Sequence, residues 1–380
     1  MKSVYAMKLE HLYDLWDQYE GEKRWSCFTD RNSRFAIYGA GFIGVRIASL
    51  LKEQFGASPF AFIDRKAEEG IYYVDNIPVY SRCELFAIAG DIPVGVALKS
   101  YLNGKDAKEI NETLSAAGFS RIINIATFDA YDNDFFYINE IDREKTVCVI
   151  DMLRDRVSKE QYYSYIYSRV WKTQFYAPTY PASSSYCATE LFWLNEKDHV
   201  LDCGAFDGDS AQQFLFNFPD LRYITMFEPD PILYERLNNW IQRISNKDIR
   251  AVPKAVGNIN GEIGFVFEND EASRIDNKSK DKVICCRIDD MEFDTPPSFI
   301  KMDIEGAELE ALHGAEKTIL KFRPILAVSC YHKASDIYEI PLFIKKLRYD
   351  YRVFFKKHRH MYNSFDFNMF AIPPERLLSR

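Results

Sequence analysis

The sequence of 380 residues lacks the features that define several common classes of protein. It contains no apolar run long enough to cross a membrane, and its first residues do not resemble a secretory signal peptide. The eight cysteines include no CxxC pair, and several lie inside apolar runs, which indicates buried free thiols in a reducing cytoplasm. We therefore expect a cytoplasmic protein without membrane insertion and without a metal site.

The sequence also lacks an excess of positive charge. Its 48 Lys and Arg residues are outnumbered by 56 Asp and Glu residues, and the formal net charge is −8. This balance argues against a nucleic-acid partner. The one basic cluster, residues 356–360, is expected at a solvated hairpin end. With 47% hydrophobic and 27% charged residues the chain should be globular, and its length suggests two domains.

A glycine turn near the N-terminus has the spacing of a dinucleotide fingerprint. Residues 34–44 predict a strand that enters the turn Gly39-Ala-Gly41-Phe-Ile-Gly44, and a second strand ends on Asp64, twenty positions later. In doubly wound sheets such glycines let a phosphate approach a helix N-terminus, and the acid binds a ribose. We expect a nucleotide site at these four residues, or, as the alternative, a turn that only packs a helix onto a strand.

Strands and helices alternate to about residue 126 and predict a Rossmann-like domain over residues 1–126, led by an amphipathic helix at 5–19. This part resembles the nucleotide-sugar-recognising half-domains found ahead of some bacterial sugar-modifying enzymes. Residues 127–197 are expected to form a helical connector and cover, with a helix over 151–171. Its later aromatic residues should pack between domains or, alternatively, line an acceptor pocket: Tyr176, Tyr180 and Tyr186.

A second glycine turn, rich in acids, opens the C-terminal half. Residues 199–210 predict a buried strand that reaches Asp202, a tight turn, and a helix that begins at Asp209 or Ser210. The next strand ends on Glu228. Three acids in the turn would repel a pyrophosphate but suit a cationic ligand, and Glu228 can accept both hydrogen bonds of a ribose diol. S-adenosylmethionine, with its sulfonium, ammonium and ribose, meets these requirements; the alternative is a turn whose acids only cap a helix. The predicted cofactor contacts here are Asp202, Gly204, Ala205, Asp207, Gly208, Asp209, Glu228 and Pro229.

Three ordered motifs resemble the FkbM family of methyltransferases. They are Val200-Leu-Asp-Cys-Gly-Ala-Phe-Asp-Gly-Asp209, Phe227-Glu-Pro-Asp230 and Ile300-Lys-Met-Asp-Ile-Glu-Gly-Ala-Glu-Leu309. The resemblance implies a class I enzyme that uses S-adenosylmethionine, usually to O-methylate a sugar or a natural product. It places the methyltransferase domain at residues 198–380, with a late antiparallel pair of strands, and makes Glu305 a further cofactor-site residue.

Two residues are candidates for catalysis. Asp303 ends the predicted strand 298–303, and His332 follows the next strand, so both should lie on the rim that holds the cofactor. Methyl transfer needs an aligned acceptor oxygen and sometimes a base. Asp303 could instead contact the methionine ammonium or cap a helix, and His332 could be a partly buried structural side chain. Asp303 and Glu305 could also bind a divalent cation, but the sequence reveals no third ligand.

The sequence thus predicts an α/β protein of two Rossmann-like domains that methylates a hydroxyl of a sugar or glycan-related compound, as in polysaccharide biosynthesis. Its cofactor would be S-adenosylmethionine, with a nucleotide or nucleotide-sugar in the N-terminal domain and a small molecule or sugar as acceptor. Two alternatives stay open: a nucleotide-sugar oxidoreductase or epimerase that uses the N-terminal glycine turn, and a non-catalytic nucleotide-sugar sensor. The oligomeric state stays open too.

Overall fold

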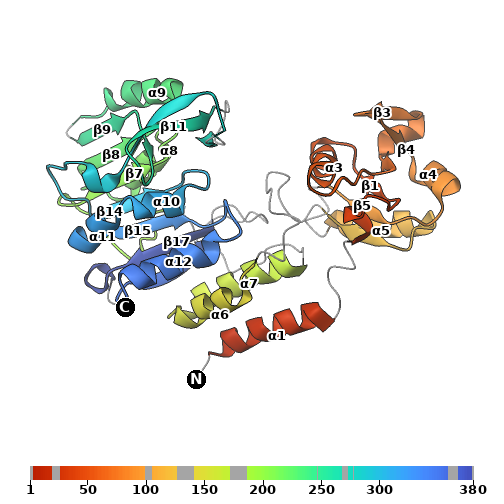
Figure 1. Cartoon of the computed structure of the whole chain (residues 1–380), viewed down its shortest axis with the longest axis horizontal. Coiled ribbons are helices and arrows are strands. Elements are labelled where there is room, and N and C mark those ends of the chain that lie inside the picture. The colour runs from red at the N-terminus through yellow and green to blue at the C-terminus, as the bar shows by residue number, and fades with distance from the viewer. Residues whose placement is uncertain are drawn as a thin grey trace.

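The computed structural model describes residues 3–18, 26–98, 105–125, 141–171, 186–245, 247–267, 273–276, 278–357 and 367–378. In these ranges the strands form a six-stranded, a seven-stranded and a four-stranded sheet. Figure 1 shows the six-stranded sheet with its helices on the right and the seven-stranded sheet on the left. The predicted α/β fold class is confirmed.

The N-terminal sheet is parallel except for one edge strand. Its order is β3-β4-β2-β1-β5-β6, and β3 pairs antiparallel with β4. Its central strands are buried along their whole length, as expected for strands covered on both faces. Strand order reverses beside β1, the place where doubly wound sheets bind ligands. The elements are β1 (Ala36–Tyr38), α3 (Phe42–Phe55), β2 (Ala61–Ile63), η1 (Arg65–Glu69), β3 (Tyr72–Val74), β4 (Ile77–Tyr80), α4 (Arg82–Ala89), β5 (Val94–Val96), α5 (Lys105–Ala116) and β6 (Ile122–Asn124).

The C-terminal sheet has the order β16-β17-β15-β14-β7-β8-β9. Five strands are parallel, and the last two in the chain are antiparallel, which confirms the predicted late pair. The strands are β7 (His199–Cys203), β8 (Tyr223–Phe227), β9 (Asp248–Val252), β14 (Phe299–Met302), β15 (Ile325–Ser329), β16 (Arg352–Lys357) and β17 (Phe367–Ile372). The helices are α8 (Asp209–Asn217), α9 (Pro231–Ile241), α10 (Glu308–His313), α11 (Glu316–Phe322) and α12 (Asp336–Leu347), with η4 (Ile288–Asp290) and η5 (Pro374–Arg376).

A small sheet stands beside the large one. It consists of β10 (Ala255–Val256), β11 (Gly261–Val266), β12 (Arg274–Ile275) and β13 (Lys282–Cys286). The predicted pairing of the two longer strands is confirmed, because β11 and β13 are antiparallel partners. Cys285 and Cys286 are neighbours on β13 and remain unbridged, and all eight cysteines are free.

Two helices that the sequence predicted as continuous are interrupted. The helix expected over 151–171 is α6 (Arg143–Met152) followed by α7 (Arg156–Trp171), and the Asp155 side chain accepts the Ser158 amide at the start of α7. The sequence after Glu305 also predicts one helix that ends near Lys321, but the structure has α10 and α11 with a break at Gly314, where a Cβ would lie 1.9 Å from the Gly257 carbonyl. Asp289 accepts two amides of α11, so side chains satisfy the free N–H groups that each break creates.

The first helix packs against the later part of the chain. The sequence analysis grouped α1 (Val4–Gln18) with residues 1–126, but α1 contacts α6 and α7, while α6 contacts α12 and α7 contacts β16. The Tyr13 hydroxyl lies 2.7 Å from Thr146 Oγ1, and the Tyr5 hydroxyl donates to Glu160. The buried face of α1, with Leu9 and Leu12, thus completes the cover of the C-terminal sheet (Figure 1).

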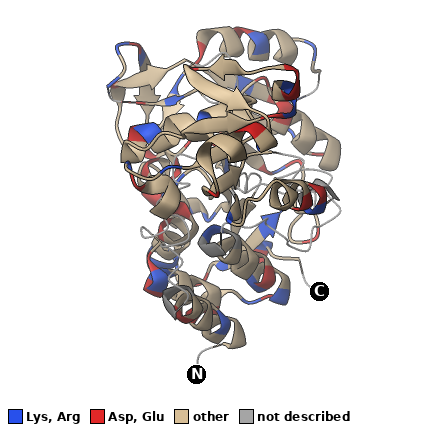
Figure 2. Cartoon of the chain, turned by 90° about the vertical axis from the view of Figure 1, so that its right-hand side faces the viewer, with Lys and Arg blue, Asp and Glu red and all other residues tan. Residues whose placement is uncertain are grey.

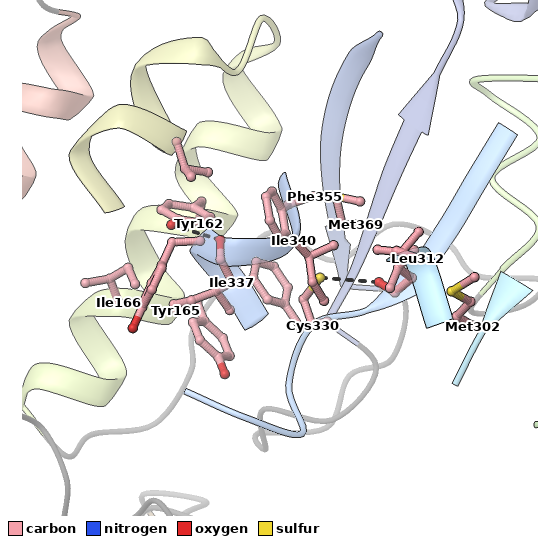
Figure 3. Close-up of a cluster of buried hydrophobic side chains, with 14 of the residues drawn as sticks. Tyr162, Tyr165, Ile166, Met302, Leu312, Cys330, Ile337, Ile340, Phe355 and Met369 are labelled. Carbon is pink, nitrogen blue, oxygen red and sulfur yellow. Dashed lines mark hydrogen bonds between the residues drawn. The ribbon is translucent and has the colours of Figure 1, made fainter. Parts of the chain in front are cut away.

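Helix α7 protects the edge of that sheet. Ser158 accepts the amide of Phe355 and Gln161 accepts the amide of Lys357, so these N–H groups of edge strand β16 are satisfied. Tyr162 is fully buried against Phe355, and its hydroxyl donates to the Ile337 carbonyl (Figure 3). The aromatic face predicted for this helix is therefore core packing.

In the view of Figure 2, acidic and basic residues are interspersed along the same helices. None of the helices described is long and apolar enough to cross a membrane.

Candidate active site

Four candidate residues meet at one edge of the C-terminal sheet. Asp202 lies near the end of β7, Glu228 directly follows β8, and Asp303 directly follows β14. His332 is the third residue after β15. These four strands are consecutive neighbours and run parallel. Their carboxyl ends therefore share one rim, as the sequence predicted, and this is where open α/β sheets bind ligands.

The glycine turn fits closely onto the neighbouring strands. Gly204 has φ +78°, and a Cβ there would lie 1.9 Å from the Asp303 carbonyl oxygen, so only glycine fits. The amides of Gly204 and Ala205 both donate to the Phe227 carbonyl at 3.1 Å. Gly208, with φ +91°, caps the start of α8. The turn is thus locked to β8 and β14 before any ligand binds.

Asp202, one of the predicted cofactor contacts, is paired with a buried lysine. It is fully buried, and its Oδ1 lies 3.0 Å from the Nζ of Lys301, which is also buried. Lys301 donates to the Gly204 carbonyl at 2.6 Å. Burial raises the pKa of Asp202, although Lys301 opposes that rise. The Asp202–Lys301 pair therefore supports the turn through the hydrogen bond from Lys301 to the Gly204 carbonyl. The sequence analysis missed Lys301. The feature that could have indicated its role is a lysine inside an otherwise apolar strand.

Glu228 is the buried acid that faces the turn. Its Oε2 accepts the Phe206 amide at 3.0 Å and its Oε1 accepts the Asp230 amide at 2.9 Å, while 6% of the residue is exposed. Burial raises the pKa of Glu228 to about 7, and the two amides only partly offset this effect. The carboxylate is therefore short of compensating donors, which a ribose diol would supply.

The remaining predicted contacts surround this carboxylate. Ala205 is buried, Pro229 is half-buried, and Asp207 and Asp209 are exposed. Asp209 accepts the Ser210 amide at 2.6 Å in the first turn of α8, where a negative charge is favoured.

Asp303 is held by two tyrosines. Its Oδ2 accepts the Tyr186 hydroxyl at 2.8 Å, and its Oδ1 accepts the Tyr331 hydroxyl at 3.1 Å. Burial works to raise the pKa of Asp303, but Lys301, His332 and the Tyr186 hydroxyl outweigh it and lower the pKa. A quarter of the side chain is exposed, so this carboxylate is fixed yet accessible. The spacing of residues in the sequence did not indicate that Tyr186 and Tyr331 contact Asp303.

His332 lies between three carboxylates. Its Nδ1 is 2.9 Å from Glu308 Oε1, and its Nε2 is 3.5 Å from Asp303 Oδ1 and 3.4 Å from Glu305 Oε1. Glu308, the first residue of α10, is fully buried and also accepts the Ile304 amide at 2.9 Å, so it braces the turn before the helix. Burial works to lower the pKa of His332, but Glu308, Glu305 and Asp303 raise it well above its usual value.

The structure thus brings Asp303, Glu305 and His332 together, each offering one ligand atom within 4.8 Å of the others. The sequence analysis found no third metal ligand beside Asp303 and Glu305, and it predicted no metal site. His332 supplies that ligand atom. Tyr186 contacts this group, whereas Tyr176 and Tyr180 lie outside the residues that the structure describes.

The N-terminal glycine turn is tied to its acid. The Ala40 amide donates to Asp64 Oδ2 at 3.1 Å, and Asp64 Oδ1 accepts the Lys66 amide. A Cβ on Gly44 would lie 1.9 Å from the Gly39 carbonyl, so packing alone requires a glycine at position 44. Gly41 caps α3 and has open space where a Cβ would stand. Of the three glycines, only Gly41 is left unexplained by packing.

An acid-rich glycine turn on a parallel sheet that ends in a late antiparallel pair defines a methyltransferase domain. Residues 202–353 match the family model of the methyltransferase FkbM domain. The matched residues include every site residue named above on the C-terminal sheet except Tyr186, so the site lies in the part of the chain that matches a methyltransferase FkbM domain.

The fold of the whole chain has a close counterpart. The crystal structure of methyltransferase FkbM from Methylobacillus flagellatus KT matches with a TM-score of 0.72 and 19% identity, over 97% of this chain and 99% of that chain. A putative rRNA-methylase from Clostridium thermocellum matches over 50% of this chain and 90% of its own, with 10% identity and a TM-score of 0.33. Comparison with curated proteins gives no match.

Proposed function

We propose that this methyltransferase uses S-adenosylmethionine and transfers the methyl group to a hydroxyl of a sugar or glycan-related compound. The observation that carries the proposal is the Glu228 carboxylate, which is buried at the glycine turn and bonded to the turn's Phe206 amide. A carboxylate in this position has lone pairs for a ribose diol but too few donors of its own.

The other residues of the turn fit the same cofactor. Asp207 and Asp209 are exposed acids beside the turn, and they would repel a phosphate but attract a cation. When bound, S-adenosylmethionine supplies an activated methyl group on a positive sulfonium. The residues of this chain hold the ribose at Glu228 and keep the turn rigid through the Asp202–Lys301 pair.

Asp303 is the residue best placed to receive the acceptor. It stands one strand away from the turn, and its carboxylate is oriented by Tyr186 and Tyr331. Its exposed quarter can accept a hydrogen bond from the acceptor hydroxyl and so align the oxygen for an in-line transfer. His332 is more deeply buried, with 8% of its side chain exposed, and it stabilises the charge on Asp303 from 3.5 Å.

The N-terminal domain supports a sugar-linked acceptor. Gly41 leaves open space at the start of α3, and Asp64 lies beside the turn. A nucleotide or nucleotide-sugar is the ligand for which such a turn is suited. The net charge of −8 favours a small or sugar acceptor over a nucleic acid, and the free cysteines favour the cytoplasm.

Calorimetric titration of S-adenosylmethionine tests the proposal. Glu228→Ala removes two charge-assisted hydrogen bonds, each worth roughly 1.5–3 kcal/mol gross, so affinity should fall at least about tenfold. Glu262→Ala removes an exposed carboxylate on β11 and serves as the matched control. Unchanged affinity in a folded Glu228→Ala protein would contradict the assignment.

Mass spectrometry of what co-purifies with the protein separates the alternatives. S-adenosylhomocysteine or S-adenosylmethionine supports the methyltransferase, a nicotinamide dinucleotide that turns over replaces it with an oxidoreductase, and a nucleotide-sugar alone supports a sensor.

A further inference from the structure

We infer that Asp303, Glu305 and His332 form a site for one divalent metal ion, with Mn²⁺ the best-fitting of the common ions. The site exists independently of the proposed function; only its role in catalysis rests on that function. Three different positions on the rim supply the donors, since Asp303 directly follows β14, Glu305 lies in the turn after it, and His332 follows β15.

The spacing of the donors suits a shared ion. His332 Nε2 lies 3.5 Å from Asp303 Oδ1 and 3.4 Å from Glu305 Oε1. Two ligands that bind one ion at about 2.1 Å lie about 3.0 Å apart at right angles and about 3.4 Å apart at the tetrahedral angle. The two observed separations lie at and just above the upper end of this range, and they exceed the usual length of an N–H···O hydrogen bond, while all three donor atoms lie within 4.8 Å of one another.

The ring nitrogen that faces the two carboxylates is a second, independent observation. His332 Nε2 is buried and forms no hydrogen bond within the part of the chain that the structure describes. Only 8% of the His332 side chain is exposed, so little solvent reaches it. A buried nitrogen left without a donor or acceptor is costly. An ion bound between Nε2 and the two carboxylates removes that cost.

Glu308 prepares His332 for this role. Its Oε1 lies 2.9 Å from His332 Nδ1, and the fully buried carboxylate is fixed by the Ile304 amide. With Nδ1–H donated to Glu308, an incoming ion displaces the proton from Nε2, and the freed lone pair then points at the space beside Asp303 and Glu305. A carboxylate behind a histidine is the usual partner of a metal-bound imidazole, because it sets the tautomer and the ring orientation.

The donor set selects the kind of ion. Two carboxylates and one imidazole, without a thiolate, favour a hard or borderline divalent cation, and Mn²⁺ accepts both donor types. Three protein donors leave further coordination positions for water or for an acceptor oxygen. Asp303 and Glu305 are 25% and 30% exposed, so these positions open toward solvent.

In the proposed reaction, the ion would bind the acceptor hydroxyl and make it more acidic. The hydroxyl would lose its proton to water, and its oxygen would form the bond to the methyl carbon. The carbon–sulfur bond would break, and its electron pair would stay on sulfur.

Binding of Mn²⁺ to the full-length chain, without cofactor, tests the site. The signal of free Mn²⁺ in electron paramagnetic resonance should reveal one bound ion per chain. Glu305→Ala and Asp303→Asn should each weaken binding at least about tenfold, since losing even an outer-shell partner costs about 10–100-fold. Glu262→Ala, which removes an exposed carboxylate elsewhere, should bind Mn²⁺ as the wild type does. Competition with Mg²⁺ and Zn²⁺ ranks the ions.

The outcomes separate this inference from the proposed function. One bound ion that is weakened by both variants supports the site, even where S-adenosylmethionine fails to bind. The site is overturned if the wild type binds none of the three ions, or if folded Glu305→Ala and Asp303→Asn bind Mn²⁺ as tightly as the wild type. Either of these results leaves the cofactor test at Glu228 untouched. Asp303→Asn retains a side-chain oxygen for the tyrosine hydroxyls, and Glu305 is partly exposed, so both variants should fold.

Discussion

Cofactor binding should depend on pH through Glu228. In the free protein, burial raises the pKa of this carboxyl to about 7, so near neutral pH it is only partly ionised. Hydrogen bonds from a ribose diol favour the carboxylate and lower its pKa. Binding therefore requires Glu228 to lose its proton, and the protein should release protons as the cofactor binds.

The size of the effect follows from the pKa. Below pH 7 the affinity for S-adenosylmethionine should fall by about tenfold for each pH unit, until the pKa of the bound state is reached. At pH 6.5 about three quarters of the protein carries the proton, so binding should release about three quarters of a proton. Above pH 8 the affinity should no longer change on account of this group.

The titration of Glu228 also makes the stability of the folded protein depend on pH. Its folded pKa of about 7 lies above the ordinary value of 4.5, so the folded state binds the proton more tightly than the unfolded state. The resulting stabilisation is fully present below pH 4.5 and is lost as pH rises through 7. It is on the order of 3 kcal/mol. The free protein is therefore less stable at pH 8 on account of Glu228, and the cofactor should recover part of that loss.

Calorimetry in two buffers of different ionisation enthalpy measures the affinity and the proton release together. The charged groups nearest Glu228 are Asp230 and Lys301, and the cofactor has an amino group of its own. Glu228→Gln measured over the same pH range isolates the carboxyl, because the variant keeps these groups and loses the titration. A wild-type affinity that stays constant from pH 5.5 to 7.5, without proton release, would refute the reasoning.

Two further predictions concern the acceptor and the N-terminal domain. His332→Ala should cut turnover by at least about tenfold, because it removes a ligand of the ion that would bind the acceptor hydroxyl, while calorimetry shows near-normal cofactor affinity; normal turnover on the true acceptor would make His332 structural. Gly41→Val should abolish the rise in unfolding temperature that a nucleotide-sugar produces, yet leave the free protein intact, because a Cβ at Gly41 meets nothing within 4 Å. If no nucleotide-sugar or nicotinamide dinucleotide stabilises the wild type, the turn serves packing only.

The sequence predicted the rim of the site because an apolar run and the acid at its end can be recognised within one short segment. Apolar runs that end on acids predict parallel strands with carboxylates at their tips, and β7, β8 and β14 bring these tips together. Glu228 and Asp303 therefore stand where the sequence placed them. The late antiparallel pair of β16 and β17 followed from the family resemblance, since β16, with the sequence RVFFKK, carries three basic residues and has no clear apolar pattern.

The sequence could not predict which distant residues contact the site residues. Tyr186 reaches Asp303 across 117 residues, and Tyr5 on α1 reaches Glu160 across 155. Periodicity states which face of an element is apolar, but not which distant element covers it. Helix breaks such as that at Gly314 depend likewise on a contact with another segment, here the Gly257 carbonyl.

The buried pair of Asp202 and Lys301 supports the glycine turn, and this support can be tested directly. Lys301→Met leaves Asp202 buried without its partner, so the free energy of unfolding should fall by about 3–5 kcal/mol. Adding Asp202→Asn removes the orphaned charge and should restore most of that loss. Cofactor affinity should stay low in the double variant, because Lys301 no longer holds the Gly204 carbonyl. Denaturant unfolding and calorimetry measure the two effects separately. If Lys301→Met alone were as stable as the wild type, Asp202 would have to be uncharged or hydrated, and it would again be available as a cofactor ligand.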